Sequence, residues 1–246
     1  MKVDFTTGIR ICVRFSCYLL ATLCLAGPVQ ASGALTPHVA EYNVRISVVS
    51  GRLRTELKAT ETGYSAEHSV RATGMSRLIA RGEITEVSDF DSGPDGLYPL
   101  AYRAKDTLSR DKSRADIQFD WGTNQAMGTV NGQEFEATLP GLSHDRVSIQ
   151  YELMHDLLND GPGERYRMFD IDKQRLLDIR SVGTKRVKVP AGSFEAIGIQ
   201  HQAENSSRVT TLWCVKELGY LPVIIEQHRK GKLRVLAKRR SYAPTD

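Results

Sequence analysis

The chain has 246 residues, of which 41% are hydrophobic and 25% are charged. This balance excludes a disordered chain, which would be poor in apolar residues and dominated by one sign of charge. The 20 glycines and 9 prolines follow no strict period, which excludes collagen-like and low-complexity sequences. The length suits a single domain once a short leader is set apart.

The first 31 residues have the three parts of a secretory signal peptide. A basic segment with Arg10 and Arg14 precedes an apolar run over residues 15–26, and a breaker with a small-residue triplet follows over 27–31. The run is shorter than the roughly 20 residues needed to cross a bilayer, so we expect cleavage, with an uncleaved anchor as the alternative. The sequence therefore predicts a signal peptide over 1–31, one β-rich domain over 32–246 and a periplasmic location, without a transmembrane span after cleavage.

Three of the four cysteines lie in this leader, so the mature chain keeps only Cys214. A single thiol cannot form an internal disulfide, which agrees with export to a compartment that oxidises paired thiols. Cys214 lies between Trp213 and Val215 in an apolar stretch. This setting favours a packing role over that of a nucleophile.

Without the leader the chain has 30 basic and 28 acidic residues, a net charge of +2. It lacks the concentrated basic face typical of nucleic-acid-binding proteins, so we expect no nucleic-acid partner. A basic C-terminal hairpin has two interpretations, a charged edge strand protected against sheet-to-sheet pairing, or a contact with anionic lipid head groups. Its cations are Arg229, Lys230, Lys232, Arg234, Lys238, Arg239 and Arg240.

The mature chain begins with apolar residues that recur with a period of two, the pattern of half-buried antiparallel strands. We expect strands over residues 42–48, 53–59 and 64–70, with a turn at Ser50-Gly51. One helical turn is predicted over 74–80, and a loop over 91–96.

The middle of the chain repeats the strand pattern. Residues 115–121 alternate in polarity, and two further runs over 125–139 flank Asn131-Gly132. Because this dipeptide tolerates the positive φ angles of a type I′ turn, we expect a tight hairpin here.

One segment departs from the period of two. From Asp145 to Asn159 the apolar residues recur at the helical period of 3.6, and a Gly/Pro-rich stretch over 160–163 then ends the helix. Ser143 or Asp145 can cap its start by accepting hydrogen bonds from free backbone N–H groups. A lone amphipathic helix must bury its apolar face, so we expect it across the open side or mouth of a curved sheet.

Strands resume after the helix and continue to the C-terminus. We expect them over residues 166–171, 176–182, 186–189, 194–201, 210–215, 220–228 and 233–240, with turns at 190–192 and 216–219. About a dozen strands, one long helix and no βαβ alternation predict an all-β fold. The expected architecture is an antiparallel meander that forms an open or half barrel, similar to a β-spiral, with one packed amphipathic helix.

The sequence has no motif typical of a catalytic or metal site. A Gly-x-Ser-x-Gly elbow, a phosphate-binding glycine loop and a His-Glu-x-x-His helix are all missing, so we expect no catalytic residue, no metal ligand and no cofactor. His144-Asp145 and His155-Asp156 bracket the helix, and a cap and a polar helix face explain them better than an acid–base pair. The histidines lie on separate elements: His38, His68, His144, His155, His201 and His228.

The tryptophans raise the question of a groove. Trp121 is in phase with the inward apolar side chains of its strand, whereas Trp213 is out of phase with Leu212 and Cys214. Either both faces of that strand are covered, or one face borders a groove that can seat an acyl chain or a peptide. A third possibility is that the barrel fills its interior with its own side chains.

Three segments in their order and spacing resemble a known family. They are residues 142–153 (LSHDRVSIQYEL), residues 189–196 (VPAGSFEA), and residues 211–213 (TLW) followed by 218–223 (LGYLPV). The family they resemble is an exported, periplasmic bacterial one, domain of unknown function 3108. The resemblance implies an antiparallel β fold, partly barrel-like or spiral, in the bacterial envelope. It implies no activity, ligand or catalytic residue.

These observations favour a non-catalytic periplasmic protein that binds a lipid, a lipoprotein or an envelope partner in or along a curved sheet. One alternative is an envelope hydrolase, for which His144, His155 and Cys214 are the candidate residues. The other is a structural envelope factor without a pocket.

Overall fold

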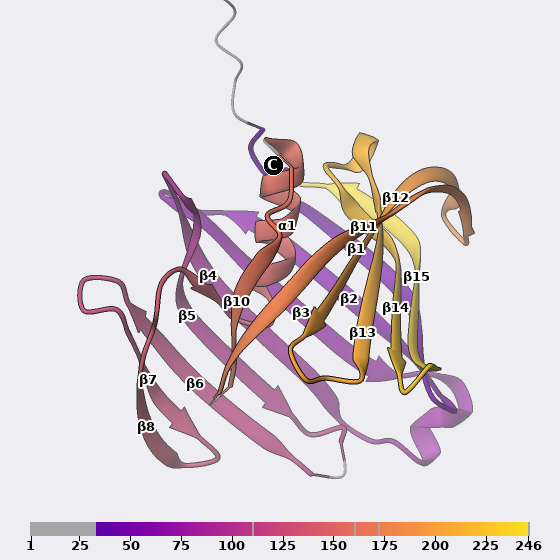
Figure 1. Cartoon of the computed structure of the whole chain (residues 1–246). Helices are drawn as coiled ribbons and strands as arrows, with labels where there is room; N and C mark the ends of the chain where they lie inside the picture. Colours follow the sequence, from indigo (N-terminus) through magenta and orange to yellow (C-terminus); the bar gives the residue numbers. More distant parts are fainter. Residues whose placement is uncertain (1–32, 110, 160, 172, 246) are drawn as a thin grey trace, which may run out of the picture. The chain divides into compact units, whose positions relative to one another are not determined.

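The computed structural model describes residues 33–109, 111–159, 161–171 and 173–245, so the predicted signal peptide lies outside the described residues. Fifteen strands in this part of the chain form one sheet, in the order β8-β7-β6-β5-β4-β3-β2-β1-β15-β14-β13-β12-β11-β10-β9 (Figure 1). Strands β9 and β10 pair in parallel, and the other neighbours pair antiparallel. The predicted all-β open sheet is confirmed.

The first half of the sheet is a meander, with a short 3-10 helix, η1, where one helical turn was expected. Its elements are β1 (His38–Ile46), β2 (Val49–Ala59), β3 (Gly63–Ala72), η1 (Gly74–Leu78), β4 (Glu83–Gly93), β5 (Gly96–Asp106), β6 (Ser113–Asp120), β7 (Gln125–Val130) and β8 (Gln133–Thr138). Asn131 and Gly132 have φ angles of 54° and 82°, which confirms the predicted type I′ hairpin.

Two turns in this half differ from the prediction. The first hairpin turns at Ser47-Val48 rather than Ser50-Gly51, because Ser47 adopts a φ of 54° and Gly51 pairs with β1. Val48 is therefore 85% exposed instead of facing the core. The loop expected over residues 91–96 is only a two-residue turn, since Gly93 and Gly96 pair at the ends of β4 and β5.

The second half of the chain supplies the helix and the other side of the sheet. Its elements are β9 (Ser143–His144), α1 (Ser148–Leu158), β10 (Arg165–Asp170), β11 (Lys173–Val189), β12 (Gly192–Ala203), β13 (Arg208–Val215), η2 (Lys216–Leu218), β14 (Leu221–Arg229) and β15 (Lys232–Pro244). The two strands expected over 176–182 and 186–189 are one strand, β11, with an irregularity between Ser181 and Thr184.

The basic C-terminal hairpin does not lie at an edge of the sheet. Strand β15 pairs with β1 on one side and with β14 on the other, and the sheet ends at β8 and β9. The edge-strand interpretation of its cations is therefore wrong. Arg239, one of these cations, is only 3% exposed and lies over the ring of Phe194.

Asp145, rather than Ser143, caps the start of the helix. Its Oδ1 accepts hydrogen bonds from the backbone N–H groups of Val147 (2.7 Å) and Ser148 (2.9 Å). Its Oδ2 accepts a hydrogen bond from Ser88 Oγ of β4 at 2.5 Å. This fully buried carboxylate therefore fastens the helix start to the sheet.

The helix packs between the two sides of the curved sheet. It contacts β4, β5 and β9, and Figure 1 shows it between the indigo-to-magenta strands and the orange strands β10 to β13. Tyr151 and Met154 of the helix belong to the same core cluster as Tyr42 and Phe90 of the sheet. Among the described residues, no helix has the length and hydropathy required to span a membrane.

The face of β13 that carries Trp213 is covered, which decides between the interpretations of this residue. Leu212 and Cys214 pack in a cluster with Leu153 of the helix. Trp213 packs in a different cluster, with Val187 of β11 and neighbouring apolar residues. The exposed fraction of Trp213 is 7% and that of Cys214 is 1%, so neither borders a groove.

Candidate functional site

A cavity of about 1010 Å³ lies between the two sides of the sheet. Residues of β4 to β7 line one wall and residues of β10 to β14 line the other. Ile149, Gln150 and Leu153 contribute from the first half of the helix, and Arg146 contributes from just before its start. The interior is therefore not filled by its own side chains. The open space lies beside the helix and not at Trp213, the residue for which the sequence left a groove as one interpretation.

One part of the cavity wall is apolar. Side chains from the helix, β11, β13 and β14 pack together here in a single cluster. The members that line the cavity include Ile149, Leu153, Ile179, Leu212 and Ile225. A continuous apolar wall of this kind suits the hydrocarbon part of a ligand.

The lining also contains charged side chains, with an excess of cations. Three acidic side chains line the cavity, Glu86, Asp106 and Asp170. Seven basic side chains also line it: Lys105, Arg114, Arg146, Lys173, Arg175, Arg208 and Arg229. The excess of positive charge favours an anionic group over a cationic one.

Two of these arginines are held in place by one carboxylate. The Nε atoms of Arg146 and Arg175 each lie 2.6 Å from an oxygen of Asp170. Burial opposes ionisation of Asp170, but the two guanidinium groups hold its pKa below the usual value. Arg146 Nη1 also lies 3.6 Å from Glu86 Oε1, so these two arginines face two carboxylates, and the excess of cations comes from the rest of the lining. The N–H donors that these contacts leave unused can still bind an anionic ligand.

The cavity also presents neutral polar groups. Gln150 Nε2 is buried and lacks a hydrogen-bond partner among the described residues. Burial lowers the pKa of His201 to about 4, so its imidazole is neutral near pH 7. A ligand can therefore gain hydrogen bonds here without displacing existing ones.

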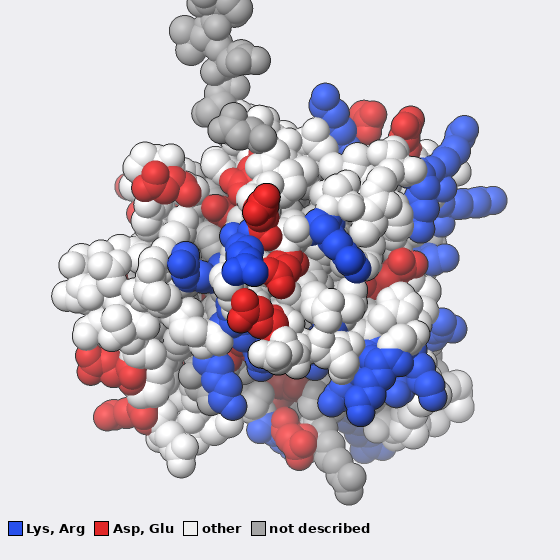
Figure 2. Space-filling model, in the orientation of Figure 1, with Lys and Arg blue, Asp and Glu red and all other residues white. Residues whose placement is uncertain are grey.

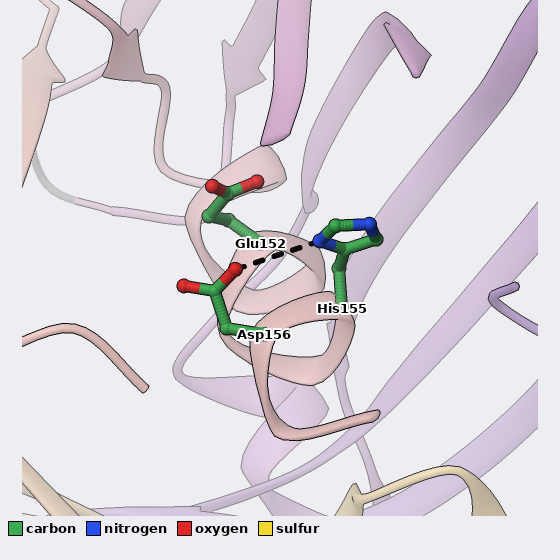
Figure 3. Close-up of side chains that lie close together, drawn as sticks. All are labelled: Glu152, His155 and Asp156. Atoms are coloured by element: carbon green, nitrogen blue, oxygen red, sulfur yellow. Dashed lines mark hydrogen bonds and ion pairs between the residues drawn. The ribbon is translucent and has the colours of Figure 1, made fainter. Parts of the chain in front are cut away.

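A second group of polar side chains lies on the helix itself. Glu152, His155 and Asp156 present oxygen and nitrogen atoms that all lie within 4.8 Å of one another. Figure 3 shows them on adjacent turns, with His155 Nδ1 and Asp156 Oδ1 joined at 3.5 Å. Their spacing of i, i+3 and i+4 is the sequence signal that would have revealed this cluster.

Glu152 is the buried member of this cluster, with 3% of its surface exposed. Its Oε2 accepts a hydrogen bond from the Leu97 N–H at 2.7 Å, and its Oε1 lies 3.8 Å from Nε2 of buried His144. Burial raises the pKa of Glu152 to about 7 and lowers that of His144 to about 4. Near pH 7 the imidazole is therefore neutral and the carboxyl is partly protonated.

The three residues considered for a hydrolase do not meet at one place. His144 and His155 both lie near Glu152, and the carboxylate of Asp156 raises the pKa of His155. Cys214 packs instead among apolar side chains, and burial raises the pKa of its thiol. Asp145, which follows His144, bonds to the helix start rather than to that imidazole. The carboxylates of Glu152 and Asp156 and the imidazole of His155 form a set of donors that can ligate a divalent metal, although the sequence predicts no metal site.

Residues 39–235 match the family described as "Protein of unknown function (DUF3108)". The chain belongs to this family. No curated protein matches the DUF3108 chain. Among solved structures, it is similar to a crystal structure described as a beta-barrel-like protein of domain of unknown function DUF1849 from Brucella abortus. The TM-score is 0.58 and the identity 10%, covering 87% of this chain and 100% of the other, and at this identity the likeness shows the fold alone.

Residues 142–153 are the first of the three segments of this DUF3108 chain that resemble the family. They contribute to the cavity and to the polar cluster on the helix. They include the helix cap Asp145, the cavity residues Arg146 and Gln150, and the buried carboxyl of Glu152. The sequence placed this segment at a helix start, and the structure adds that the same helix start lines the cavity.

Proposed function

We propose that this DUF3108 protein is a non-catalytic binding protein that holds an anionic amphiphile, an acyl chain with an acidic head group, in the cavity beside its helix. The observation that carries the proposal is the cavity itself, which combines an apolar wall with an excess of basic side chains. The leader sequence supports a site of action in the periplasm.

The size of the cavity suits such a ligand. Ligand-binding pockets commonly measure about 300–1,000 Å³, and this cavity is at the upper end of that range. Each methylene group transferred from water to the apolar wall contributes roughly 0.8 kcal/mol, so ten buried methylenes contribute about 8 kcal/mol before the costs of ordering. This is enough for binding without a deeply buried ion pair.

The charged lining supports an acidic rather than a neutral head group. Arg146 and Arg175 are each about two-fifths exposed and share the carboxylate of Asp170, and Arg146 Nη1 also lies 3.6 Å from Glu86 Oε1. Their free N–H donors can bind a carboxylate or a phosphate with the planar geometry that guanidinium groups favour. Gln150 adds an amide donor whose hydrogen bonds are unused.

Fluorescence titration of the full chain with a polyene fatty acid tests the proposal, with the fatty alcohol of the same length as the neutral comparison. Saturable binding of the acid, tighter than that of the alcohol, is the expected result. Ile179→Trp fills the apolar wall and should abolish binding of both probes. Ile197→Trp is its control, because Ile197 packs against the same cluster without lining the cavity.

Charge variants separate the head group from the chain. Arg175→Gln should weaken binding of the acid about tenfold, or about 1.4 kcal/mol, and leave that of the alcohol unchanged. Arg103→Gln removes an arginine of similar exposure that pairs with Asp89 outside the cavity, and should change neither. Absence of saturable binding, or unchanged binding by Ile179→Trp, would overturn the proposal.

A further inference from the structure

Three turns meet at one end of the sheet: the β1–β2 turn, η1 after β3, and the β14–β15 turn. Ser47 donates its N–H to Arg234 O at 2.8 Å, which joins the first turn to the third. Thr73 donates to Ser50 O at 2.9 Å, and Ser50 donates to Ser76 Oγ at 2.9 Å, which joins the first turn to η1. We name residues 45–50, 73–82 and 229–235 together the docking end.

The docking end carries most of the exposed apolar side chains of the described residues. Nine large hydrophobic side chains are exposed in this part of the chain, and six of them lie here. They are Val48 (85% exposed), Met75 (78%), Ile79 (73%), Leu78 (64%), Leu233 (39%) and Ile46 (38%). Single exposed apolar residues are ordinary, but a group of six on adjoining turns marks an interaction surface.

The η1 segment shows that these apolar residues do not serve the core. None of its residues is buried, and its side-chain hydrogen bonds to the sheet come from Ser76 and Arg77. Met75 and Leu78 therefore project from the protein without stabilising it, which is costly in water unless another apolar phase receives them.

The charges on the same three segments indicate which apolar environment receives these side chains. The three segments contain no Asp or Glu, and all their cations are exposed: Arg45, Arg77, Arg81, Arg229, Lys230, Lys232 and Arg234. Figure 2 shows Lys and Arg side chains gathered over the ends of β13 to β15, at the lower right. Exposed apolar residues surrounded by cations, with no acidic residue among them, complement the surface of an anionic lipid bilayer.

The cavity reaches this same end of the sheet. Its lining includes Asp106 at the end of β5, Ser113 at the start of β6, and Arg229 at the end of β14. Arg229 belongs to both surfaces, and the neighbouring Lys230 donates its N–H to Ser207 O, another lining residue, at 3.1 Å. The docking end and the cavity rim are therefore continuous.

We propose that the docking end binds an anionic bilayer surface, with its apolar side chains at the acyl boundary and its cations on the lipid phosphates. The cavity then opens toward the bilayer, so that an amphiphile passes between membrane and protein without crossing water. This second step rests on the proposed function, whereas the docking step does not.

Cosedimentation of the full chain with lipid vesicles tests the docking step. We expect binding to phosphatidylcholine vesicles that contain about a third phosphatidylglycerol, weak binding to phosphatidylcholine alone, and release by salt. The triple variant M75S/L78S/I79S and the triple variant K230Q/K232Q/R234Q should each reduce vesicle binding at least tenfold. All variants share the same N-terminal residues, so any contribution from that segment is common to them.

Matched controls use exposed residues elsewhere on the sheet. L100S/M127S removes two exposed apolar side chains outside the docking end, and Arg103→Gln removes an exposed cation, so both should bind vesicles as the unchanged chain does. Wild-type affinity in M75S/L78S/I79S, or equal binding to neutral and anionic vesicles, would overturn the proposal. Probe binding measured without vesicles separates the two proposals: docking variants should keep it, and Ile179→Trp should lose it while still binding vesicles.

Discussion

Replacement of Trp213 by alanine tests whether the face of β13 that carries this residue is covered. The ring packs over Gly198, where an added Cβ would come within 2.7 Å of Trp213 Cζ3. Its Nε1 donates a hydrogen bond to Glu226 at 3.1 Å, and Lys185 Nζ lies 3.5 Å from the ring centroid. At 7% exposure the whole ring is lost from the cluster on truncation.

The expected cost of Trp213→Ala is about 3–5 kcal/mol in the free energy of unfolding, the usual range for removing a buried aromatic ring. Trp213→Phe keeps a ring over Gly198 and loses mainly the hydrogen bond to Glu226, so about 1–2 kcal/mol is expected. Urea unfolding followed by circular dichroism measures both values. A cost below about 1 kcal/mol for the alanine variant would refute the reasoning, because it would mean that the ring lines open space.

Other variants test the polar interior. Asp145→Ala should cost about 3–5 kcal/mol in unfolding free energy because three buried donors lose their acceptor, whereas Asp145→Asn keeps an acceptor and should cost about 1–2 kcal/mol. Burial raises the folded pKa of Glu152 to about 7 from 4.5, so its protonated form is favoured on folding and stability falls as pH rises through this interval. Glu152→Gln removes this loss, and its gain in unfolding free energy should be larger near pH 8 than near pH 5 by about 1–3 kcal/mol; an equal gain at both would contradict the assignment. Burial lowers the pKa of His68, His144 and His201 to about 4 from 6.5, so folding favours their neutral form. Their contribution to the free energy of unfolding is present above pH 6.5 and is lost as the pH falls toward 4. Acid unfolding by circular dichroism should become less steep in His201→Gln, and an unchanged profile would count against a buried neutral imidazole.

Local patterns in the sequence were sufficient for most of the strands and for the helix. The alternation over residues 42–48 and the Asn131-Gly132 pair depend only on neighbouring residues, and both predicted strands with the correct partners. The first turn was misplaced because Gly51 is a stronger turn signal than Ser47, yet the pairing of β1 with β2 requires Ser47 to adopt the positive φ. Gly183, whose φ is 88°, made β11 look like two strands, although it marks an irregularity within one.

The order of strands in the sheet could not be predicted in the same way. The basic hairpin looks like an edge strand because seven cations lie within twelve residues, but β15 pairs with β1 across almost the whole length of the chain. Its neighbour β1 lies about 200 residues earlier in the sequence, and no local pattern records such a pairing.

The same limit applies to the candidate site. Helical periodicity places Gln150 on the same side of the helix as Leu153 and Leu157, the side that the sequence predicts to pack against the sheet. In the structure that side faces the cavity, because β10 to β14 curl around the helix. The burial of Glu152 depends on Leu97 and His144, which come from β5 and β9 and are brought together only by the fold.

A crystal structure of the full chain grown with a saturated long-chain fatty acid tests most directly whether the cavity receives an amphiphile. The acyl chain should lie against Leu212 and Ile225, with its carboxylate within about 3 Å of the guanidinium groups of Arg146 or Arg175. A cavity that holds only water, or a fatty acid bound elsewhere on the protein, would contradict the account.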